Sequence, residues 1–369
     1  MAELSRGPVD FSFLLHPLSR EDVYRKFAFM SKWPSSVVEG IMRVIPPIFT
    51  SRITGIKSPH RSVEGSFYSI PLTTRKMLEL PAKVTVGKII AAGKKAARDG
   101  AKIIGLGAMT AVVGDGGITA ARHLDIAVTT GNSYTVATAL EGTEKAAELM
   151  GLDFTKADVA ILGATGSVGS ACARIMARKV RSLTLIARDI RRLEKLAEKI
   201  LAETGLTPDV TSDIKSAIRK ADIIVAVSSS AETLVEAEDL KPGAIVCDVA
   251  RPRDVSVSVK EKRDDVLIIE GGVVEVPGNV NFNFNFGFPP GMAYACMAET
   301  MILALEQRYE NFSLGKEMSV EQIDEIRSLA VKHGFKLAGF RSFERALSTE
   351  DIMQIKERAR EKQGLGIRD

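Results

Sequence analysis

The most regular pattern in the chain begins at Asp158, where short apolar runs alternate with longer amphipathic stretches. Five runs are apolar at nearly every position: DVAILG, SLTLIAR, ADIIVAVSS, AIVCDVA and VLIIEGG. Strands that are apolar on both faces are typical of parallel sheets covered by helices on each side. The pattern therefore predicts a doubly wound parallel sheet of the Rossmann type.

The first 150 residues mix the same kinds of element less regularly. FSFLLH and GSFYSIPL read as strands, VGKIIAAGKKAARDG has helical spacing, and AKIIGLGA and LDIAVTTG are apolar runs that end in glycines. This mixture predicts an α/β lobe. A helix is expected over GNSYTVATALEGTEKAAELMG, with Asn132 or Ser133 as its cap and Gly151 at its end.

Composition narrows the class of protein. The 369 residues are 45% hydrophobic and 26% charged, and a formal charge of +4 is too small for a nucleic-acid-binding signature. No secretory signal opens the chain, and no apolar run approaches the roughly 20 residues that span a bilayer. Three scattered cysteines and four histidines without paired spacing predict no disulfide framework and no metal site. A cytoplasmic protein is expected.

A glycine-rich turn joins the first apolar run of the regular region to the helix after it. In VAILGATGSVGSACAR, the spacing predicts a phosphate-binding turn, because glycines let a pyrophosphate approach bare backbone at a helix N-terminus. A tight turn without a ligand is the alternative. The predicted cofactor-binding residues are Gly163, Ala164, Thr165, Gly166, Ser167, Val168 and Gly169, together with Ser228 after the third strand.

The end of the second apolar run bears on the choice of cofactor. Arg188 occupies the position that often carries a ribose-binding acid, and an arginine there suits the 2′-phosphate of NADP. Arg191 or Arg192 could assist. Asp189 is the rival, because an acid at this point would favour NAD. We expect NADPH, with a solvated Arg188 as the alternative.

Three parts of the chain are expected. Residues 1–150 would form an α/β lobe with substrate and catalytic groups, residues 151–277 an NADP-binding Rossmann domain, and residues 278–369 a helical segment that returns to the cleft. In that segment, helices are expected at about 291–310 and 319–333. A surface helix is expected within Ser342–Asp369, where Ser348 and Asp351 have capping-box spacing.

Four stretches together resemble the long-chain acyl-[acyl-carrier-protein] reductases of cyanobacteria and their bacterial relatives. They are TTGNSYTVATALEGTEKAAELMG, VAILGATGSVGSACAR, IIEGGVVE and AYACMAETMILALEQRYENFSLGKEMSVEQIDEIRSLAVKHGF. The resemblance implies that NADPH reduces a fatty acyl thioester to a fatty aldehyde, and that Cys296 carries the acyl group. It also implies a distant likeness to shikimate dehydrogenases, although their N-x-T-x-P-x-K motif is absent. The segment VPGNVNFNFNFGFPPG departs from the family, so carrier protein and coenzyme A both stay open as acyl donors.

The chemistry of Cys296 follows from this resemblance. A thiolate is both a good nucleophile and a good leaving group, and a free cysteine, with a pKa of about 8.5, needs a helix N-terminus or a cation to ionise. Cys296 is expected about five residues into its helix, where the dipole helps only in part. Asn132 and Ser133 are the candidate oxyanion donors. The alternatives are a packed core cysteine, and an oxidoreductase similar to shikimate or amino-acid dehydrogenases that forms no acyl-enzyme.

Each of the remaining candidate residues has a structural interpretation as well as a functional one. Cys172, Cys247 and His16 are expected to be structural, and Tyr294 is expected to be an interface aromatic rather than a proton donor. The basic segment Arg43–Arg61 could dock an acidic carrier protein or be a solvated loop. The following residues could line an acyl pocket or belong to a half-buried strand: Phe282, Phe284, Phe286, Phe288 and Met292. The oligomeric state is not predicted.

Overall fold

The computed structural model describes residues 7–26, 28–285 and 288–364, and the chain forms two compact units. Unit 1 consists of residues 1–134, 274–318 and 324–336, and unit 2 of residues 135–273, 319–323 and 337–369. The sequence suggested boundaries after residues 150 and 277, whereas the units change at residues 134 and 273 and divide the C-terminal segment between them. Helix α6 (Asn132–Met150) carries the chain out of unit 1.

Unit 1 contains a six-stranded mixed sheet in the order β13-β2-β3-β1-β4-β5. Strand β1 is parallel to β3 and β4, β4 is parallel to β5, and β2 is antiparallel to β3 and β13. The strands are β1 (Phe11–Leu15), β2 (Ile48–Lys57), β3 (Ser62–Ser69), β4 (Ile103–Gly105), β5 (Ala127–Thr129) and β13 (Gly278–Asn281). Strands β1 and β3 therefore confirm the strands predicted in FSFLLH and GSFYSIPL.

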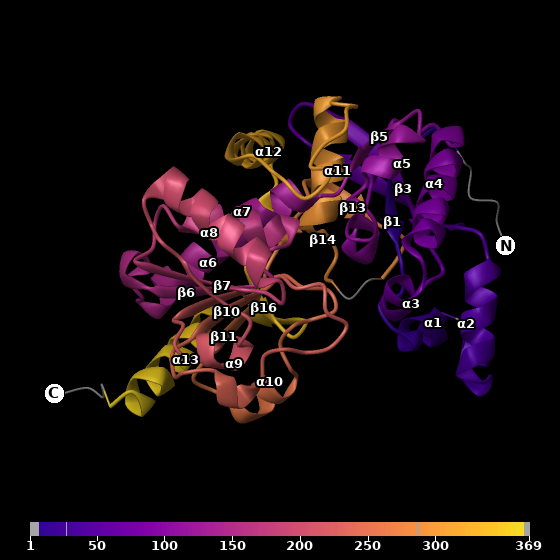
Figure 1. Ribbon diagram of the computed structural model, residues 1–369. Coiled ribbons are helices and arrows are strands. Elements are labelled where there is room, and N and C mark those ends of the chain that lie inside the picture. The colour runs from indigo at the N-terminus through magenta and orange to yellow at the C-terminus, as the bar shows by residue number, and fades with distance from the viewer. Residues whose placement is uncertain (1–6, 27, 286–287, 365–369) are drawn as a thin grey trace. The chain divides into compact units, whose positions relative to one another are not determined.

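Two helices cover opposite faces of this sheet (Figure 1). Leu14 of β1 packs in a core cluster with Ile89 and Ala92 of α4 (Ala82–Arg98). On the other face, a Cβ at Gly105 of β4 would lie 2.0 Å from Thr300 Oγ1 of α11 (Ala295–Glu306) and 2.5 Å from the ring of Phe13. Successive strand residues point to opposite faces, so Phe13 and Leu14 separate the two layers.

Shorter helices complete unit 1. They are α1 (Arg20–Lys26), η1 (Ala28–Lys32), α2 (Ser35–Val44), α3 (Thr74–Glu79), η2 (Ala108–Ala111) and α5 (Ile118–Arg122). Helix α12 (Val320–His333) confirms the expectation at 319–333. Three short strands lie where the chain changes unit or approaches α11: β12 (Val273–Glu275), β14 (Met292–Tyr294) and β15 (Lys336–Leu337).

Unit 2 is built on a six-stranded parallel sheet in the order β11-β10-β9-β6-β7-β8. The strands are β6 (Asp158–Leu162), β7 (Ser182–Ile186), β8 (Asp209–Thr211), β9 (Ile223–Ala226), β10 (Ile245–Asp248) and β11 (Leu267–Glu270). This is the strand order of the Rossmann fold, so the predicted α/β class is confirmed. The edge strand β8 was not predicted, because its residues are partly or fully exposed and only Val210 is apolar.

Helices pack on this sheet, and the C-terminal segment adds a hairpin and a helix. The helices are α7 (Ser167–Met176), α8 (Ile190–Thr204), α9 (Ile214–Ile218), α10 (Ser258–Lys262), η3 (Phe154–Lys156) and η4 (Ala237–Asp239). Strands β16 (Phe340–Ser342) and β17 (Arg345–Leu347) precede α13 (Thr349–Lys362). The capping box of α13 is confirmed, since Ser348 Oγ accepts from the Asp351 amide at 3.1 Å and Asp351 accepts from the Ser348 amide at 2.8 Å.

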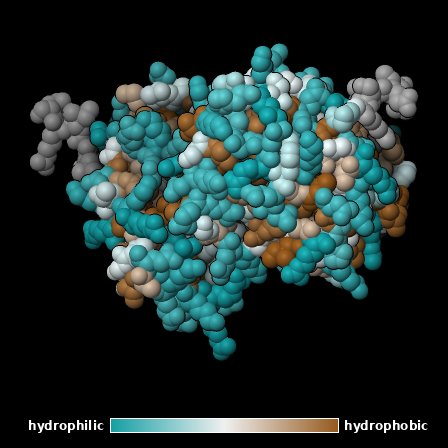
Figure 2. Space-filling model, turned by 90° about the horizontal axis from the view of Figure 1, so that it is seen from above, coloured by the Kyte–Doolittle hydropathy of each residue, from teal (hydrophilic) through white to brown (hydrophobic). Residues whose placement is uncertain are grey.

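The face drawn in Figure 2 is mainly hydrophilic with scattered apolar patches. None of the described helices combines the length and apolar character needed to cross a membrane. Among the described residues, His, Cys, Asp and Glu side chains form no group of three or more that could hold a metal ion.

Candidate active site and nucleotide site

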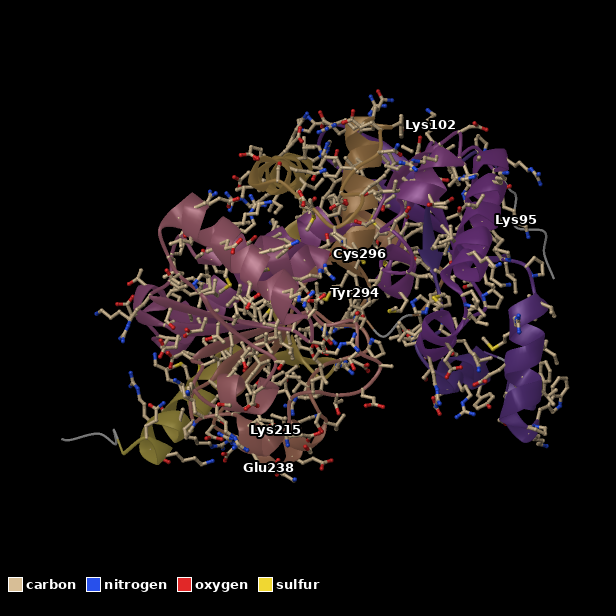
Figure 3. The ribbon with its side chains drawn as sticks, in the orientation of Figure 1. Lys95, Lys102, Lys215, Glu238, Tyr294 and Cys296 are labelled. Atoms are coloured by element: carbon tan, nitrogen blue, oxygen red, sulfur yellow. The ribbon has the colours of Figure 1, made fainter. Side chains whose placement is uncertain are left out.

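Cys296 lies in the first turn of α11, closer to the helix N-terminus than the sequence suggested. Pro289, Pro290 and Gly291 lead into the extended strand β14, and α11 begins only at Ala295, with Tyr294 as its N-cap. The expected helix start at about 291 was wrong, because the chain stays extended through Tyr294. No side chain caps α11, so Cys296 lies beside helix amides that favour a nearby negative charge (Figure 3).

Accessibility separates Cys296 from the other two cysteines. Cys172 on α7 and Cys247 on β10 are fully buried, and Cys296 is partly exposed. Burial raises the pKa of Cys247 to about 12 and the pKa of Cys172 still further, so both remain thiols at neutral pH. The expectation that these two cysteines are structural agrees with this burial, and Cys296 is the cysteine that a reagent can approach.

A second helix N-terminus lies against Cys296. Gly131, directly before α6, has φ of 74°, and a Cβ at this position would lie 2.3 Å from Cys296 Cα and 2.4 Å from Cys296 Cβ. Only glycine permits both this left-handed conformation and this approach. The first turns of α6 and α11 therefore meet at Cys296.

Asn132 and Ser133, the residues expected to cap α6, are its first two residues and lie inside the helix rather than before it. The Ser133 hydroxyl is buried and lies 3.5 Å from Met318 Sδ, to which it donates. Because Ser133 Oγ is engaged elsewhere, the donor that Ser133 can offer an oxyanion is its backbone amide at the helix N-terminus.

Glu299 supplies the cap that the sequence did not reveal. Its carboxylate is fully buried one turn after Cys296, and Oε2 accepts from the Tyr134 amide at 2.8 Å. Oε1 accepts from Ser313 Oγ at 2.6 Å and from Thr129 Oγ1, and the Gly131 amide also donates to the carboxylate. Burial raises the pKa of Glu299, and these donors oppose that shift. The one signal in the sequence was an acid in the middle of the apolar helix ACMAETMILALE, whose other acid is its last residue.

Aromatic residues form two groups before α11. Phe282 and Phe284 lie 6.0 and 6.2 Å from the ring of Phe67 on β3, and Phe288 lies 4.5 Å from the ring of Tyr294. Phe286 lies outside the described residues, and Met292 is half-buried. Phe282 is almost fully buried while Phe288 is half-buried, so the two groups differ in how open they are to a ligand.

His16 is a satisfied structural histidine, as predicted. Its Nδ1 lies 3.0 Å from the Pro17 carbonyl, and its Nε2 accepts from the Met109 amide at 3.1 Å. This pairing requires a neutral ring with the proton on Nδ1. Burial lowers the pKa of His16 to about 4, which agrees with the neutral form.

The basic segment Arg43–Arg61 is not a loop over most of its length, because β2 occupies its centre. Arg52 forms a salt bridge with Glu64 at 2.6 Å and donates to the Gly7 carbonyl at 2.9 Å. Arg43 lies at the end of α2, whereas Lys57 and Arg61 lie at the other end of β2. The ten residues of β2 extend about 33 Å, so these charges are divided between its two ends.

In unit 2, the glycine turn lies between β6 and α7 with the geometry of a phosphate-binding turn. Gly163 has φ of 88°, and a Cβ there would lie 2.9 Å from Ser228 Cα. A Cβ at Gly169 would lie 2.4 Å from the Gly163 carbonyl oxygen. Gly166 is the N-cap of α7 and no side chain caps this helix, so its first amides are available to a ligand.

One atom in this turn lacks a partner that an anion would supply. Ser167 Oγ is buried at the start of α7 and has no hydrogen-bond partner among the described residues. A buried hydroxyl without a partner is unfavourable, and a phosphate oxygen at the helix N-terminus would accept from it. The residues present therefore fit the pyrophosphate of a dinucleotide.

Ser228 lies under the glycine turn and binds a buried carboxylate. Its amide donates to Asp254 Oδ2 at 2.8 Å, and its hydroxyl donates to Asp254 Oδ1. Asp248 is also buried and accepts from the amides of Ala250 and Val255 at 3.1 Å. Burial raises the pKa of Asp254 to about 6 and raises that of Asp248 as well.

The candidate phosphate-reading residues lie at the start of α8. Asp189 is the N-cap of α8, where its side chain accepts from the Arg192 amide at 3.2 Å. Arg192 reaches back to the glycine turn and donates to the Thr165 carbonyl at 2.7 Å. Arg188 is exposed. Asp189 is thus engaged by its own helix. Arg192 places positive charge beside the glycine turn, and Arg188 lies next to Asp189 in the chain.

The chain matches one protein family over part of its length and two known proteins over most of its length. The family of shikimate / quinate 5-dehydrogenases matches residues 144–269. The long-chain acyl-[acyl-carrier-protein] reductase of Synechococcus elongatus is 28% identical over 309 residues, which are 80% of this chain and 87% of that protein. Aminotransferase PigE of Serratia sp. is 31% identical over 297 residues, which are 79% of this chain. The chain spans about a third of PigE, 34% of its length.

Solved structures are more distant. The A chain of dipicolinate synthase from Bacillus subtilis is 15% identical with a TM-score of 0.35, over 70% of this chain and 87% of that chain. The nucleotide-binding domain of glutamyl-tRNA reductase from Thermoplasma volcanium is 20% identical with a TM-score of 0.27, over 38% and 86%. At these TM-scores neither likeness supports an argument about function. The family match covers the glycine turn and most of the parallel sheet of unit 2.

Proposed function

We propose that this chain is an NADPH-dependent reductase of long-chain fatty acyl thioesters that forms an acyl-enzyme at Cys296 and releases a fatty aldehyde. The observation that carries the proposal is the position of Cys296. It is the partly exposed cysteine of the chain, and the N-termini of α6 and α11 meet at it. Similarity to a long-chain acyl-[acyl-carrier-protein] reductase over 80% of the chain supports the substrate class.

The acylation step uses residues of unit 1. Cys296 Sγ attacks the carbonyl carbon of the thioester, and the electron pair of the C=O bond moves to the oxygen. The amides of Asn132 and Ser133 are the proposed donors to this oxyanion. Collapse of the intermediate breaks the bond from carbon to the pantetheine sulfur, which leaves as a thiolate and takes up a proton. A thioester is exchanged for a thioester, so the carbonyl keeps its reactivity.

Unit 2 holds the cofactor in this proposal. The first amides of α7 and Ser167 Oγ bind the pyrophosphate, and Arg188, with Arg192 beside it, recognises the 2′-phosphate. NADPH supplies the hydride that reduces the acyl-enzyme. Cys296 then leaves as a thiolate when the aldehyde is released, so each turnover converts thioester, NADPH and a proton into aldehyde, thiol and NADP⁺.

The acyl donor is a long-chain thioester of acyl carrier protein or of coenzyme A. The half-buried pair Phe288 and Tyr294 precedes Cys296 in the chain, and its rings could contact an apolar acyl chain bound at Cys296. Phe282 and Phe284 pack on Phe67 and fit the alternative of a packed strand end. The basic residues are separated along β2. We therefore expect a docking patch at one end of the strand rather than a single patch over the whole of Arg43–Arg61.

Intact-mass analysis tests the covalent step. Wild-type protein mixed with palmitoyl thioester and no NADPH is expected to gain the mass of one palmitoyl group, and Cys296→Ser is expected to gain none. Cys172→Ser is the matched control, because it removes a buried thiol and should leave acylation unchanged. Wild-type protein that stays unacylated, yet oxidises NADPH with a carbonyl substrate, would instead favour a dehydrogenase without a covalent intermediate.

A further inference from the structure

Glu299 is the buried charged group closest in sequence to Cys296, and the acylation chemistry above does not use it. It lies three residues after Cys296 on α11, so one helical turn brings both side chains to the same side of the helix. No solvent reaches the Glu299 side chain. A carboxylate in such a position needs several donors to offset the loss of hydration.

The donors come from two segments that are far apart in the sequence. Thr129 Oγ1 and the amides of Gly131 and Tyr134 come from the entry to α6, and Ser313 Oγ comes from the loop after α11. Ser313 has φ of 47°, an unfavourable conformation for a residue with a side chain. Thr130 Oγ1 donates to the Ser313 carbonyl at 2.5 Å and holds that loop in place.

These bonds fix the first turn of α6 at both ends. The Gly131 and Tyr134 amides donate to the Glu299 carboxylate, and the amides of Asn132 and Ser133 lie between them in the chain. The approach of Gly131 to Cys296 sets this turn against the nucleophile. Glu299 thus links the helix that carries the thiol to the helix that begins next to it.

We propose that Glu299 is a positioning residue, whose carboxylate holds the amides of Asn132 and Ser133 where they stabilise the oxyanion formed during acylation of Cys296. The inference rests on the proposed function. Glu299 touches neither substrate nor cofactor in this role. It acts on the transition state of acylation, and it leaves the intrinsic reactivity of the thiol and the affinity for the thioester largely unchanged.

The experiment measures acylation in the absence of NADPH for Glu299→Gln, which preserves shape but replaces one accepting oxygen by an NH₂ group. Single-turnover acylation by palmitoyl thioester is expected to slow by about 100-fold, the size of effect found when an oxyanion donor is lost. The thioester concentration giving half-maximal rate should change less than threefold. Alkylation of Cys296 by iodoacetamide, which needs no oxyanion donor, should stay within about twofold of the wild-type rate.

Glu306→Gln is the matched control. It makes the same change at the other end of α11, where Glu306 pairs with Lys332 at 2.7 Å, and it should acylate at the wild-type rate. If Glu299→Gln does not fold, Thr129→Val and Thr129→Ser replace it, because only the serine keeps the hydroxyl that donates to Glu299. Acylation should fall at least tenfold in the valine variant and stay near wild type in the serine variant.

Three results would overturn the inference. The first is wild-type acylation in Glu299→Gln, and the second is equal acylation by both Thr129 variants. The third is a parallel loss of acylation and iodoacetamide alkylation, which would assign Glu299 to the thiol rather than to the oxyanion donors. A wild-type protein that is not acylated at all is a different outcome, since it removes the proposed function itself.

Discussion

Two uncapped helix N-termini, that of α7 in unit 2 and that of α11 in unit 1, use the same backbone chemistry for different purposes. Neither helix has a side-chain cap, so both keep amides available to a negative group. At α7 the turn is made of closely spaced glycines, and the anion is expected to come from outside. At α11 the charge is expected to develop on Cys296 and its substrate. A helix N-terminus is therefore a general anion site, and its neighbours decide whether it serves binding or chemistry.

Gly131 and Gly163 lie next to these two sites, and each permits a different close approach. Gly131 approaches Cys296, and Gly163 approaches the Ser228 backbone. Gly131→Ala would place a methyl group 2.3 Å from Cys296 Cα at a φ of 74°. We expect acylation to fall by about 100-fold or more, since a displacement of about 1 Å can cost that much. NADPH affinity, measured by fluorescence titration, should stay unchanged.

Gly142→Ala is the control for Gly131→Ala. Gly142 lies in α6, a Cβ there would meet its nearest neighbour at 3.8 Å, and alanine is the better helix former. Acylation should match wild type, with stability equal or slightly higher. Wild-type acylation in Gly131→Ala would show that the two helix N-termini do not need to meet.

Gly163→Ala tests the other half of the comparison. Its methyl group would lie 2.9 Å from the Ser228 backbone in a left-handed conformation, so the phosphate-binding turn has to shift. We expect the NADPH dissociation constant to rise by about 10- to 100-fold, with acylation of Cys296 retained. Gly205→Ala has a similar φ of 78° but no atom within 4 Å, and it should bind NADPH normally.

Arg188→Ala tests which cofactor the turn selects. Loss of a charge-assisted bond to the 2′-phosphate should weaken NADPH by about tenfold and NADH by less than twofold. Titration of each cofactor measures this difference. Equal losses for both cofactors would remove Arg188 from the phosphate site, and Arg192→Ala, which also loses the bond to Thr165, would then be the next variant to test.

The smallest expected effect concerns Asp254, whose pKa burial raises to about 6. The unfolded value is about 3.9, so between these values the folded state binds more protons than the unfolded state. The free energy of unfolding should therefore fall as pH rises from about 4 to 6 and level off above that range. The contribution is on the order of 1–3 kcal/mol. Urea unfolding of wild type and Asp254→Asn at pH 4.5 and pH 7 measures it, and an equal pH dependence in both would contradict it.

Unit 2 was the more predictable of the two units. Its apolar runs and glycine spacing are local signals, and each strand from β6 to β11 except β8 was expected. Strand β8 was not predicted, because an edge strand with polar residues shows little hydrophobic pattern. Arg192 could be named from its position, but its bond to Thr165 depends on how α8 packs beside the glycine turn.

Unit 1 was less predictable, because some of its features depend on contacts between distant segments. The strands predicted over FSFLLH and GSFYSIPL and the helix predicted over VGKIIAAGKKAARDG correspond to β1, β3 and α4, and Cys296 could be selected through resemblance. The start of α11 was placed too early, because the pattern of apolar residues continues through the extended strand β14. The cap of α6 was assigned to its own first residues, since local caps are the common case. The acceptor is instead Glu299, 165 residues away from Tyr134 in the chain.

The sequence by itself determined the α/β class, the Rossmann sheet and the glycine turn, because hydrophobic period and glycine spacing act over a few residues. Only the tertiary structure decided which cysteine is accessible, that Gly131 approaches Cys296, and that one buried carboxylate joins α6 to α11. These features depend on contacts between distant segments, and a buried charge is stable only where folding brings enough donors to it.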